Sequence, residues 1–316
     1  MINKLGTKFY SKILLFGEYA LMFGSDALSI PYTELYGYFS FEKDESTLTG
    51  FDLDTHLGKY AGFLRKHSEK INFETPFLFD QLDKDIANGL IFNSNIPLRY
   101  GLGSSGALVA ALYGNYVQNP VNPSQKITNR QLSKLKTLFA EMESYFHGKS
   151  SGLDPLICYL QRPVLFENGS RIKLIEPFKK NTSGQNALFL LDTGTTGETQ
   201  PLVNYFTEKC RSDDFLNQIK SELIPINKQA IEAFLQNNAN DLFPHLKEIS
   251  TFTQKYLKPM IPEAIRDVWQ KGLESNHYYL KLCGSGGGGM MLGFTTNFER
   301  VKTDIKNFPL HLVQQF

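Results

Sequence analysis

The sequence has little cysteine, and its three cysteines lie far apart. Cys158, Cys210 and Cys283 form no Cys-x-x-Cys pair. Widely spaced thiols of this kind argue against a disulfide framework and a thiolate zinc site, and they are typical of a reducing compartment. The six histidines show no paired metal-ligand spacing either. The sequence therefore points away from a resident zinc site.

Long hydrophobic runs and an excess of one charge are also missing. The longest apolar run, residues 107–113, is far shorter than the roughly 20 residues that cross a membrane, and no signal-peptide pattern opens the chain. Lys plus Arg total 33 and Asp plus Glu 32, a formal net charge of +1, so no strong field favours nucleic acid or an anionic membrane. We expect a cytoplasmic protein that binds small molecules, with neither nucleic acid nor membrane as partner. The sequence is compatible with a homodimer but does not determine the oligomeric state.

The length and composition are those of a folded protein with two domains. Hydrophobic residues make up 41% and charged residues 21% of the 316 residues, as in globular proteins, and the chain is longer than a usual single core. The polar, turn-rich segment 179–186 (KKNTSGQN) lies between apolar strand candidates. We therefore predict domains over residues 1–182 and 183–316.

The order of the predicted elements indicates the fold class. Apolar stretches around Gly17 and Gly24 predict a β-hairpin within residues 9–31. Further strands are predicted at residues 187–191, 278–282, 290–294 and 310–313. Helical patterns fill residues 213–274 and are expected to be interrupted at Pro225, Pro244, Pro259 and Pro262. This mixed order predicts an α+β fold and not a doubly wound sheet.

Two further helices surround the chemically informative segments. One is predicted to open at Ser104 or Ser105, after a Gly/Ser turn. The second is expected to be capped by Asn129 and to bury a stripe at helical spacing formed by Leu132, Leu135, Phe139, Met142 and Phe146. At 100° per residue, Glu143 falls roughly 60° from the centre of this stripe and Glu141 roughly 140° away. Glu143 is therefore expected to border a site, and Glu141 to face water.

The Gly/Ser turn, residues 101–106 (GLGSSG), formally matches the dinucleotide pattern Gly-x-Gly-x-x-Gly. That pattern requires an acidic residue about 20 positions later, and residues 107–140 contain none. Residues 148–150 (GKS) resemble the end of a P-loop, but Glu143 stands where that loop needs its first glycine. Two interpretations are left: a phosphate cradle at a helix N-terminus, or a turn that only caps a buried helix.

Three separated segments together resemble the GHMP small-molecule kinases. They are residues 11–31 (SKILLFGEYALMFGSDALSIP), residues 97–108 (PLRYGLGSSGAL) and residues 281–294 (KLCGSGGGGMMLGF). Within the family, residues 147–155 (HGKSSGLDP) and 192–203 (DTGTTGETQPLV) are most similar to mevalonate kinases. The resemblance implies the two-domain fold of the family: an N-terminal mixed sheet with helices and a C-terminal ferredoxin-like α/β sandwich.

Some positions depart from the family pattern. Tyr19 stands where many mevalonate kinases have His, although phosphomevalonate kinases also use Glu-Tyr. Gly106 replaces a common Ala, Pro155 replaces a polar residue, and Cys283 replaces a Thr or Ser. These departures bear on the acceptor more than on the kinase chemistry.

The resemblance also implies a role for each motif residue. Asp154 is the implied base for the acceptor hydroxyl, and Lys12 would stabilise the developing alkoxide and the transferring phosphoryl group. Mg²⁺ would be held by Ser105 and Glu143. ATP would be bound by the loop residues Gly101, Leu102, Gly103, Ser104, Ser105 and Gly106. The acceptor would be bound by Glu18, Tyr19, Ser151, Gly152 and Thr199, and the C-terminal glycine loop would approach the site through Gly284, Ser285, Gly286 and Gly287.

Each of these assignments has a structural alternative. Asp154 would instead cap a helix, Lys12 would be a solvated strand residue, and Thr199 would be a helix N-cap. Tyr19 would pack as an ordinary aromatic residue, and His147 is interpreted as a structural residue at a helix end.

The function that the resemblance implies is ATP- and Mg²⁺-dependent phosphorylation of the primary hydroxyl of mevalonate, a step of isoprenoid biosynthesis. The alternatives are another GHMP kinase that acts on phosphomevalonate, a sugar or homoserine, and a non-catalytic sensor of this fold. The combination of Lys12, Glu143 and Asp154 argues against the sensor, because a retired site has no chemical need for all three residues.

Overall fold

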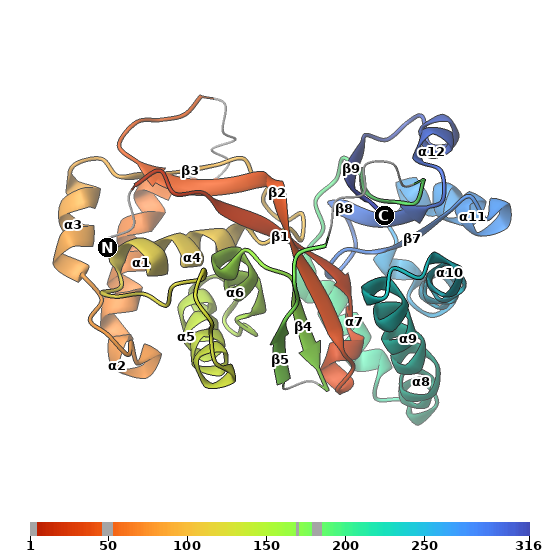
Figure 1. Cartoon of the computed structure of the whole chain (residues 1–316), viewed down its shortest axis with the longest axis horizontal. Coiled ribbons are helices and arrows are strands. Elements are labelled where there is room, and N and C mark those ends of the chain that lie inside the picture. Colours follow the sequence, from red (N-terminus) through yellow and green to blue (C-terminus); the bar gives the residue numbers. More distant parts are fainter. Residues whose placement is uncertain (1–4, 46–52, 169–170, 179–184) are drawn as a thin grey trace. The chain divides into compact units, whose positions relative to one another are not determined.

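The computed structural model describes residues 5–45, 53–168, 171–178 and 185–316, and its fold is α+β, as predicted (Figure 1). The chain divides into two compact units. The first unit comprises Met1–Ile13, Ile30–Leu98 and Leu102–Val164, and the second comprises Leu14–Ser29, Arg99–Gly101 and Leu165–Phe316. The predicted domain boundary at 182/183 falls within residues 179–184, which are outside the described part, and it stays a prediction.

The first unit contains six α-helices among the residues that the structure describes. Its helices are α1 (Leu53–Lys66), α2 (Ser68–Ile71), α3 (Phe79–Ala87), α4 (Ser104–Tyr116), α5 (Asn129–His147) and α6 (Leu153–Leu160). The first sheet has the strands β1 (Phe9–Phe16), β2 (Ala27–Ser40), β3 (Ile91–Ser94), β4 (Val164–Glu167) and β5 (Arg171–Leu174). Its order is β1-β2-β4-β5, with β3 paired antiparallel to β2 so that Gly37 faces Ser94. The predicted hairpin is confirmed as the neighbouring strands β1 and β2, within which the boundary between the units falls.

Helix α4 forms the centre of the first unit. It begins at Ser104, as predicted, after Gly103 in the left-handed conformation. Its residues from Gly106 to Tyr116 are all buried, because small and apolar side chains cover every face of the helix. Helices α5 and α6 pack directly against it (Figure 1). The Gly/Ser loop is thereby anchored to the core of the unit.

Helix α5 starts one residue away from the predicted cap. Thr128, not Asn129, is the N-cap: its hydroxyl accepts a hydrogen bond from the Gln131 N–H, and the Gln131 side chain accepts one from the Thr128 N–H. The predicted stripe is buried at its first four positions, and Phe146 is half-buried near the end of the helix. The predicted buried face of α5 is thus confirmed, and the predicted N-cap is wrong by one residue.

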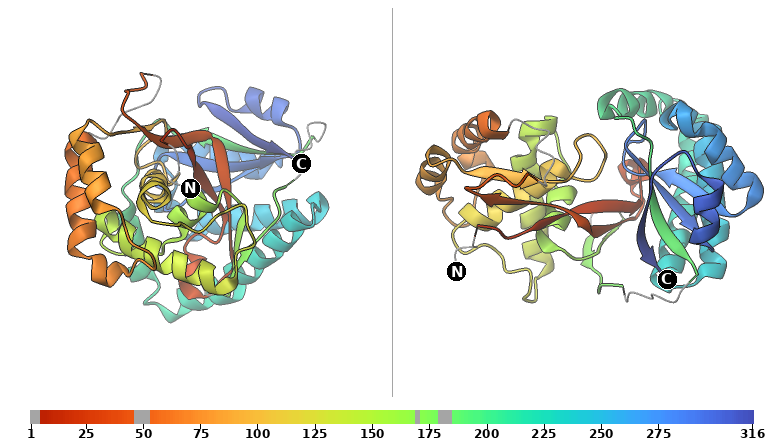
Figure 2. Two further views of the ribbon diagram at one scale, coloured as in Figure 1. Left: turned by 60° about the vertical axis from the view of Figure 1, so that its left-hand side comes forward. Right: turned by 90° about the horizontal axis from the view of Figure 1, so that it is seen from above.

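The second unit is built on an antiparallel sheet of order β7-β8-β6-β9. Its strands are β6 (Ala187–Asp192), β7 (Tyr278–Leu282), β8 (Met290–Thr295) and β9 (Leu310–Gln315), at the four predicted places. Leu190 of β6 faces Leu292 of β8 on one side and His311 of β9 on the other. The helices are α7 (Thr199–Lys209), α8 (Asp213–Gln218), α9 (Ile224–Leu235), α10 (Ala239–Tyr256), α11 (Arg266–Ser275) and α12 (Phe298–Asp304). Helices α10 and α11 pack on β7 (Figure 2).

Two of the four predicted helix interruptions are wrong. Pro225 is the second residue of α9, which follows α8 without a break through a π-helical turn at Ile219–Leu223. That wider turn relieves the clash between a proline ring and the preceding helical turn. Pro244 lies inside α10, where the buried residues Leu242 and Leu246 hold the helix on both sides. Pro259 and Pro262 follow the end of α10 at Tyr256, as predicted.

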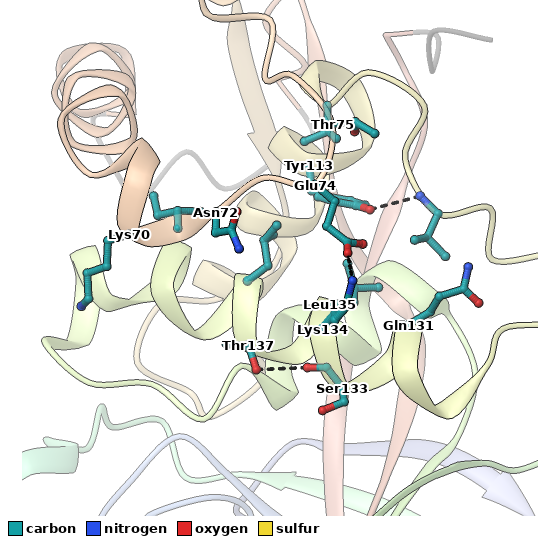
Figure 3. Close-up of a pocket in the computed structure, with 14 residues that line it drawn as sticks. Lys70, Asn72, Glu74, Thr75, Tyr113, Gln131, Ser133, Lys134, Leu135 and Thr137 are labelled. Carbon is teal, nitrogen blue, oxygen red and sulfur yellow. Dashed lines mark hydrogen bonds and ion pairs between the residues drawn. The ribbon is translucent and has the colours of Figure 1, made fainter.

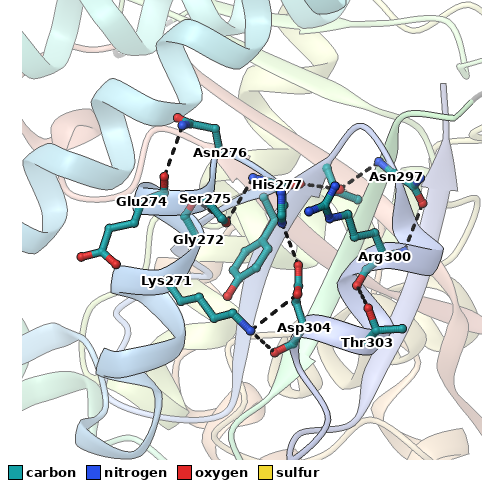
Figure 4. Close-up of polar contacts among 12 residues, drawn as sticks. Lys271, Gly272, Glu274, Ser275, Asn276, His277, Asn297, Arg300, Thr303 and Asp304 are labelled. Atoms are coloured by element: carbon teal, nitrogen blue, oxygen red, sulfur yellow. Dashed lines mark hydrogen bonds and ion pairs between the residues drawn. The ribbon is translucent and has the colours of Figure 1, made fainter.

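A polar cluster fixes the end of α12 against α11 and β7 (Figure 4). His277 Nδ1 lies 2.9 Å from Asp304 Oδ2, and Lys271 Nζ lies 3.5 Å from Asp304 Oδ1. Burial raises the pKa of Asp304, but the hydrogen bond with His277 and the charge of Lys271 outweigh burial and lower the pKa below its ordinary value. The carboxylate is therefore a charged structural link within the second unit.

Candidate active site

Lys12 and Asp154 form an ion pair in the first unit. Lys12 Nζ lies 3.0 Å from Asp154 Oδ2. Lys12 is 4% exposed, so the alternative of a solvated strand residue is wrong. The Asp154 side chain keeps 39% of its surface exposed, so a buried cation and a solvent-accessible carboxylate meet at this point. Such a pair can accept a proton and stabilise developing negative charge in one place.

The N-terminus of α6 positions Asp154. Gly152 is the N-cap in the left-handed conformation, and no side-chain cap bond is formed there, so Asp154 in the first turn is not a capping residue. A Cβ added at Gly106 would lie 2.9 Å from both the Asp154 carbonyl carbon and the Pro155 nitrogen. The Gly106 and Pro155 departures from the family pattern therefore lie against each other. Glycine at 106 lets α4 approach the backbone that carries Asp154.

Glu143 is the centre of a second polar group in the first unit. It is 4% exposed. Ser105 Oγ donates to Glu143 Oε1 at 2.9 Å, Ser150 Oγ donates to Oε2, and the Gly152 N–H donates to Ser150 Oγ at 2.9 Å. His147 Nε2 lies 3.1 Å from Ser105 Oγ. The predicted metal residues Ser105 and Glu143 are thus in direct contact.

The electrostatics of this group suit a divalent cation. Burial raises the pKa of Glu143 to about 7, the charge of Asp154 adds to the rise, and the hydrogen bonds from Ser150 and Ser105 oppose it. Burial also lowers the pKa of His147, against the opposing charge of Asp154. A buried carboxylate beside a serine hydroxyl is an oxygen-donor set of the kind that Mg²⁺ uses together with phosphate oxygens. These residues fit Mg²⁺, although no cluster of three or more His, Cys, Asp or Glu side chains occurs in the described residues.

Glu141 differs from Glu143 in the way that helical geometry predicts. It is half-buried and forms an ion pair with Lys70, with 2.7 Å between Oε2 and Nζ. The prediction that Glu141 faces water is right in direction, and the ion pair with Lys70 covers part of its surface. Two glutamates in one helix thus occupy different environments.

Other predicted site residues of the first unit lie around the same loop. The Lys12 N–H donates to the Leu102 carbonyl at 3.1 Å, which ties β1 to the Gly/Ser loop. Ser104 is the first residue of α4, and exposed Ser151 accepts a hydrogen bond from the Leu153 N–H at 3.3 Å.

The second unit brings together a different set of predicted residues. Glu18 Oε1 lies 2.5 Å from Lys281 Nζ, and the Tyr19 hydroxyl donates to the Ser285 carbonyl at 2.7 Å. Thr199 Oγ1 accepts from Ser285 Oγ at 3.2 Å. The N-cap of α7 is Glu198, so the interpretation of Thr199 as the cap is wrong by one residue. The Tyr19 ring also packs on Phe206, with 4.5 Å between ring centroids, so its aromatic packing accompanies the hydrogen bond.

Three residues of these groups were not assigned a site role from the sequence: His147, Ser150 and Lys281. His147 and Ser150 lie within the segment HGKSSGLDP, so their closeness to Asp154 in the sequence could have indicated a site role. Lys281 opens the glycine segment, but nothing in the sequence connects it with Glu18, 263 residues away.

A groove of about 300 Å³ in the first unit lies among other residues (Figure 3). Its charged side chains are paired within the protein: Lys134 Nζ with Glu74, and Lys70 with Glu141. None of the predicted site residues lines it. The groove is therefore not part of the candidate active site.

Comparison with known proteins shows which family this chain resembles. Residues 70–162 match the sequence profile described as "GHMP kinases N terminal domain". The mevalonate kinase of Pyrococcus abyssi is 24% identical over 320 residues, which cover 94% of this chain and 90% of that protein. The chain is similar to the GHMP kinases. This similarity supports a phosphotransferase that acts on an alcohol group, and similarity to a kinase family implies the use of ATP.

Further similarities extend over most of this chain. The mevalonate kinase of Archaeoglobus fulgidus is 23% identical, with 89% of each chain covered. Among solved structures, the mevalonate kinase of L. major in complex with R-mevalonate superposes with a TM-score of 0.61 at 16% identity, covering 98% of this chain and 95% of that chain. The phosphomevalonate kinase of Streptococcus pneumoniae, in complex with phosphomevalonate and AMPPNP, reaches 0.64 at 15% identity, with 98% of both chains covered. The structural similarity supports the fold; at these identities it does not distinguish acceptors.

Among the residues that the structure describes, no helix is long and apolar enough to cross a membrane.

Proposed function

We propose that this protein is a GHMP kinase that transfers the γ-phosphoryl group of ATP to the primary hydroxyl of mevalonate. The observation that carries the chemistry is the Lys12–Asp154 pair, at 3.0 Å, in the same unit as the contact between Ser105 and Glu143. The acceptor is supported by relatives named mevalonate kinase that match over 94% of the chain. In this proposal residues 101–106 bind the ATP phosphates at the N-terminus of α4, where free N–H groups and the helix dipole favour anions.

The proposed reaction needs one proton acceptor and one fixed cation from the protein. Asp154 receives the hydroxyl proton, and the freed oxygen forms a bond to the γ-phosphorus while the bond from that phosphorus to the β,γ-bridging oxygen breaks. ADP leaves with the electrons of that bond. Lys12, at 3.0 Å from Asp154, stabilises the alkoxide as it forms and the charge on the transferring group. Ser151 and Gly152 of the first unit are proposed to contribute to acceptor binding, and a role of Thr199 in acceptor binding stays a prediction.

Mg²⁺ would be held by Ser105 and Glu143, and it would neutralise phosphate charge when bound. The chain's own contribution is to keep both ligands in contact before the metal arrives, through the 2.9 Å bond between them. Ser150 holds the second carboxylate oxygen and His147 the serine hydroxyl. The ligands are therefore preorganised by α4, α5 and the segment before α6.

A phosphorylated acceptor is the main competing proposal, and charge argues against it. A second phosphate needs additional basic side chains in the pocket. The segment 147–155 contains one lysine, Lys149, which is exposed, and no arginine. Lys12 already has Asp154 as its partner. These observations favour an acceptor without a phosphate group.

A coupled ADP-release assay tests the proposal. Purified protein is given ATP and Mg²⁺ with mevalonate, phosphomevalonate, galactose or homoserine. We expect turnover with mevalonate only, and only in the presence of Mg²⁺, because the acceptor hydroxyl must be aligned before transfer. Equal or faster turnover with phosphomevalonate would reassign the acceptor. No turnover with any acceptor, together with intact ATP binding, would support the sensor alternative.

A further inference from the structure

Glu18 and Lys281 form a buried ion pair in the second unit. The side chains are 9% and 3% exposed, and Oε1 and Nζ are 2.5 Å apart. Lys281 Nζ also donates to the Leu282 carbonyl at 3.1 Å. Desolvating two charges is costly, so a buried pair adds little net stability compared with apolar residues of the same size. Stability therefore does not explain the pair. A testable explanation is that the pair fixes the position of the segments that carry Glu18 and Lys281.

Tyr19, next to Glu18, holds the same segment at a second point. Its hydroxyl donates to the Ser285 carbonyl at 2.7 Å. Burial raises the pKa of Tyr19, and the charge of Glu18 adds to the rise, so the hydroxyl stays neutral and keeps its proton for this bond. Tyr19 itself has a left-handed backbone with φ 58°, which is uncommon for an aromatic residue. Two adjacent residues therefore hold this segment: Glu18 binds Lys281, before the glycine loop, and Tyr19 binds Ser285 within it.

The glycine loop, residues 283–289, in turn packs on the beginning of the predicted phosphate loop. A Cβ added at Gly101 would lie 2.7 Å from the Cys283 carbonyl oxygen, and one added at Gly289 would lie 2.7 Å from the Tyr100 Cα. Backbone thus meets backbone at both ends of the glycine loop. A shift of the glycine loop toward these residues would therefore displace Tyr100 and Gly101, which lead into residues 101–106.

The space beside Glu18 argues against direct acceptor binding there. The cavity lined by Glu18, Lys281, Asn227 and Thr253 has a volume of about 20 Å³, which is room for about one water molecule. An organic acceptor does not fit in this cavity. The contacts of Glu18 and Tyr19 with Lys281 and Ser285 therefore suggest a different role from the predicted one of lining the acceptor pocket.

We propose that Glu18 and Lys281, assisted by Tyr19, are positioning residues that hold the glycine loop and, through it, the start of the phosphate loop. The proposal rests on the kinase function proposed above, because it assigns the pair to nucleotide binding. It predicts that loss of the pair weakens ATP binding and leaves acceptor binding unchanged.

The test compares Glu18→Gln, Lys281→Met and the double variant. Hydrogen exchange is measured for peptides that contain residues 283–289 and residues 99–104, in the intact protein without ligand. We expect exchange in both peptides to rise by about tenfold in each single variant, the effect of losing one charged hydrogen bond, and by less in the double variant, which leaves no unpaired buried charge. Val301→Ala is the matched control: it truncates a buried side chain of α12 in the same unit and should leave both peptides unchanged.

Binding measurements provide the second readout. Kd for ATP, measured by calorimetry without acceptor, should rise by about tenfold in the single variants, while KM for mevalonate stays within twofold of the wild type. This binding measurement remains decisive even if no acceptor is turned over, so it separates failure of this proposal from failure of the proposed function.

Three results would overturn the proposal. One is a rise in KM for the acceptor with unchanged loop exchange, which would restore Glu18 to the acceptor pocket. Another is hydrogen exchange in the two peptides that rises as much in Val301→Ala as in the single variants, which would make the pair merely structural. The third is a normal Kd for ATP in a variant whose loop exchange has risen. If a single variant does not fold, the double variant and Glu18→Asp decide between these outcomes, because neither leaves Lys281 unpaired in the core.

Discussion

At the scale of single residues, Asp154 is defined by contacts that its sequence motif does not show. The motif suggested a base or a helix cap, and the structure has Asp154 beside Lys12 with no cap bond. The cap interpretation failed because Gly152, in the left-handed conformation, is the N-cap of α6. Which polar atom a carboxylate meets depends on a strand far away in the sequence.

Asp154→Asn keeps the shape of the side chain and removes its ability to accept a proton. We expect kcat to fall by about 10²-fold or more, with the Kd for ATP within a few-fold of the wild type. Single-turnover kinetics and calorimetry measure the two quantities. Asp267→Asn, an exposed Asp on α11, is the control and should have normal turnover. A normal rate in Asp154→Asn would remove Asp154 from the mechanism.

Glu143 and Glu141 provide a controlled comparison on one helix. Glu143→Gln removes a charge from the proposed metal site, so the Mg²⁺ concentration for half-maximal rate should rise and kcat should fall. Glu141→Gln should change either quantity little, because loss of a partly exposed ion pair such as that with Lys70 is worth at most about 1 kcal/mol. Activity is measured against Mg²⁺ for both variants. The ligand assignment is wrong if the Glu143→Gln curve matches the wild type.

The raised pKa of Glu143 also gives a pH dependence with a defined sign. Since its pKa is about 7, protons compete with Mg²⁺ below that value, and the half-saturating Mg²⁺ concentration should be about tenfold higher at pH 6 than at pH 8. Glu143→Gln should lose most of this difference, because the amide does not titrate in the range. Mg²⁺ titrations of the rate at the two pH values provide the measurement. An equal pH dependence in the variant would assign the titration to another group.

At the scale of elements, the contact between α4 and α6 places the proposed phosphate loop beside Asp154, the proposed base. The sequence predicted the start of α4 and the apolar face of α5 because helical periodicity and a Gly/Ser turn are local signals. It gave no warning that Gly106 touches Asp154 and Pro155, because close approach between helices depends on how they pack.

Gly106→Ala separates helix propensity from packing. In an open helix the change stabilises by up to about 1 kcal/mol, whereas at Gly106 the new Cβ would lie 2.9 Å from the α6 backbone, an overpacking that costs typically about 1–3 kcal/mol. We expect net destabilisation in urea and a fall in kcat as Asp154 shifts. Gly62→Ala on α1, where nothing lies within 4 Å of the added Cβ, should stabilise the protein. If both changes stabilise the protein, the α6 backbone moves aside for the new Cβ without loss of stability, and the packing argument is wrong.

At the scale of the whole molecule, the three free thiols define a simple test of the described fold. Cys158 and Cys283 are buried and Cys210 is partly exposed. Burial raises the pKa of Cys158 and of Cys210, so few thiolates are available. We expect at most one thiol to react readily with a thiol reagent in the native protein and three in denaturant. Reductant should leave Tm unchanged. Fewer than three reactive thiols after unfolding would reveal a disulfide.

The sequence by itself determined the properties that local patterns encode. Strand positions, the opening of α4, the buried face of α5 and the resemblance to a kinase family follow from periodicity, glycine placement and three short motifs, each readable within about 20 residues. Two local predictions were wrong. The cap of α5 is not at Asn129, because Gln131 forms a capping box with the preceding residue, and the helix is not interrupted at Pro225, because a π-helical turn accommodates the proline.

Only the tertiary structure decided which of these residues meet. Ser105 and Glu143 are 38 positions apart and Glu18 and Lys281 are 263 apart, yet each pair is in direct contact. Burial then set their chemistry, because removal from water raises the pKa of Glu143 and makes the Glu18–Lys281 pair costly unless it is geometrically fixed. Charge and residue type are properties of the chain, but desolvation and distance are properties of the packed molecule, and those two quantities decide what an ionisable side chain does.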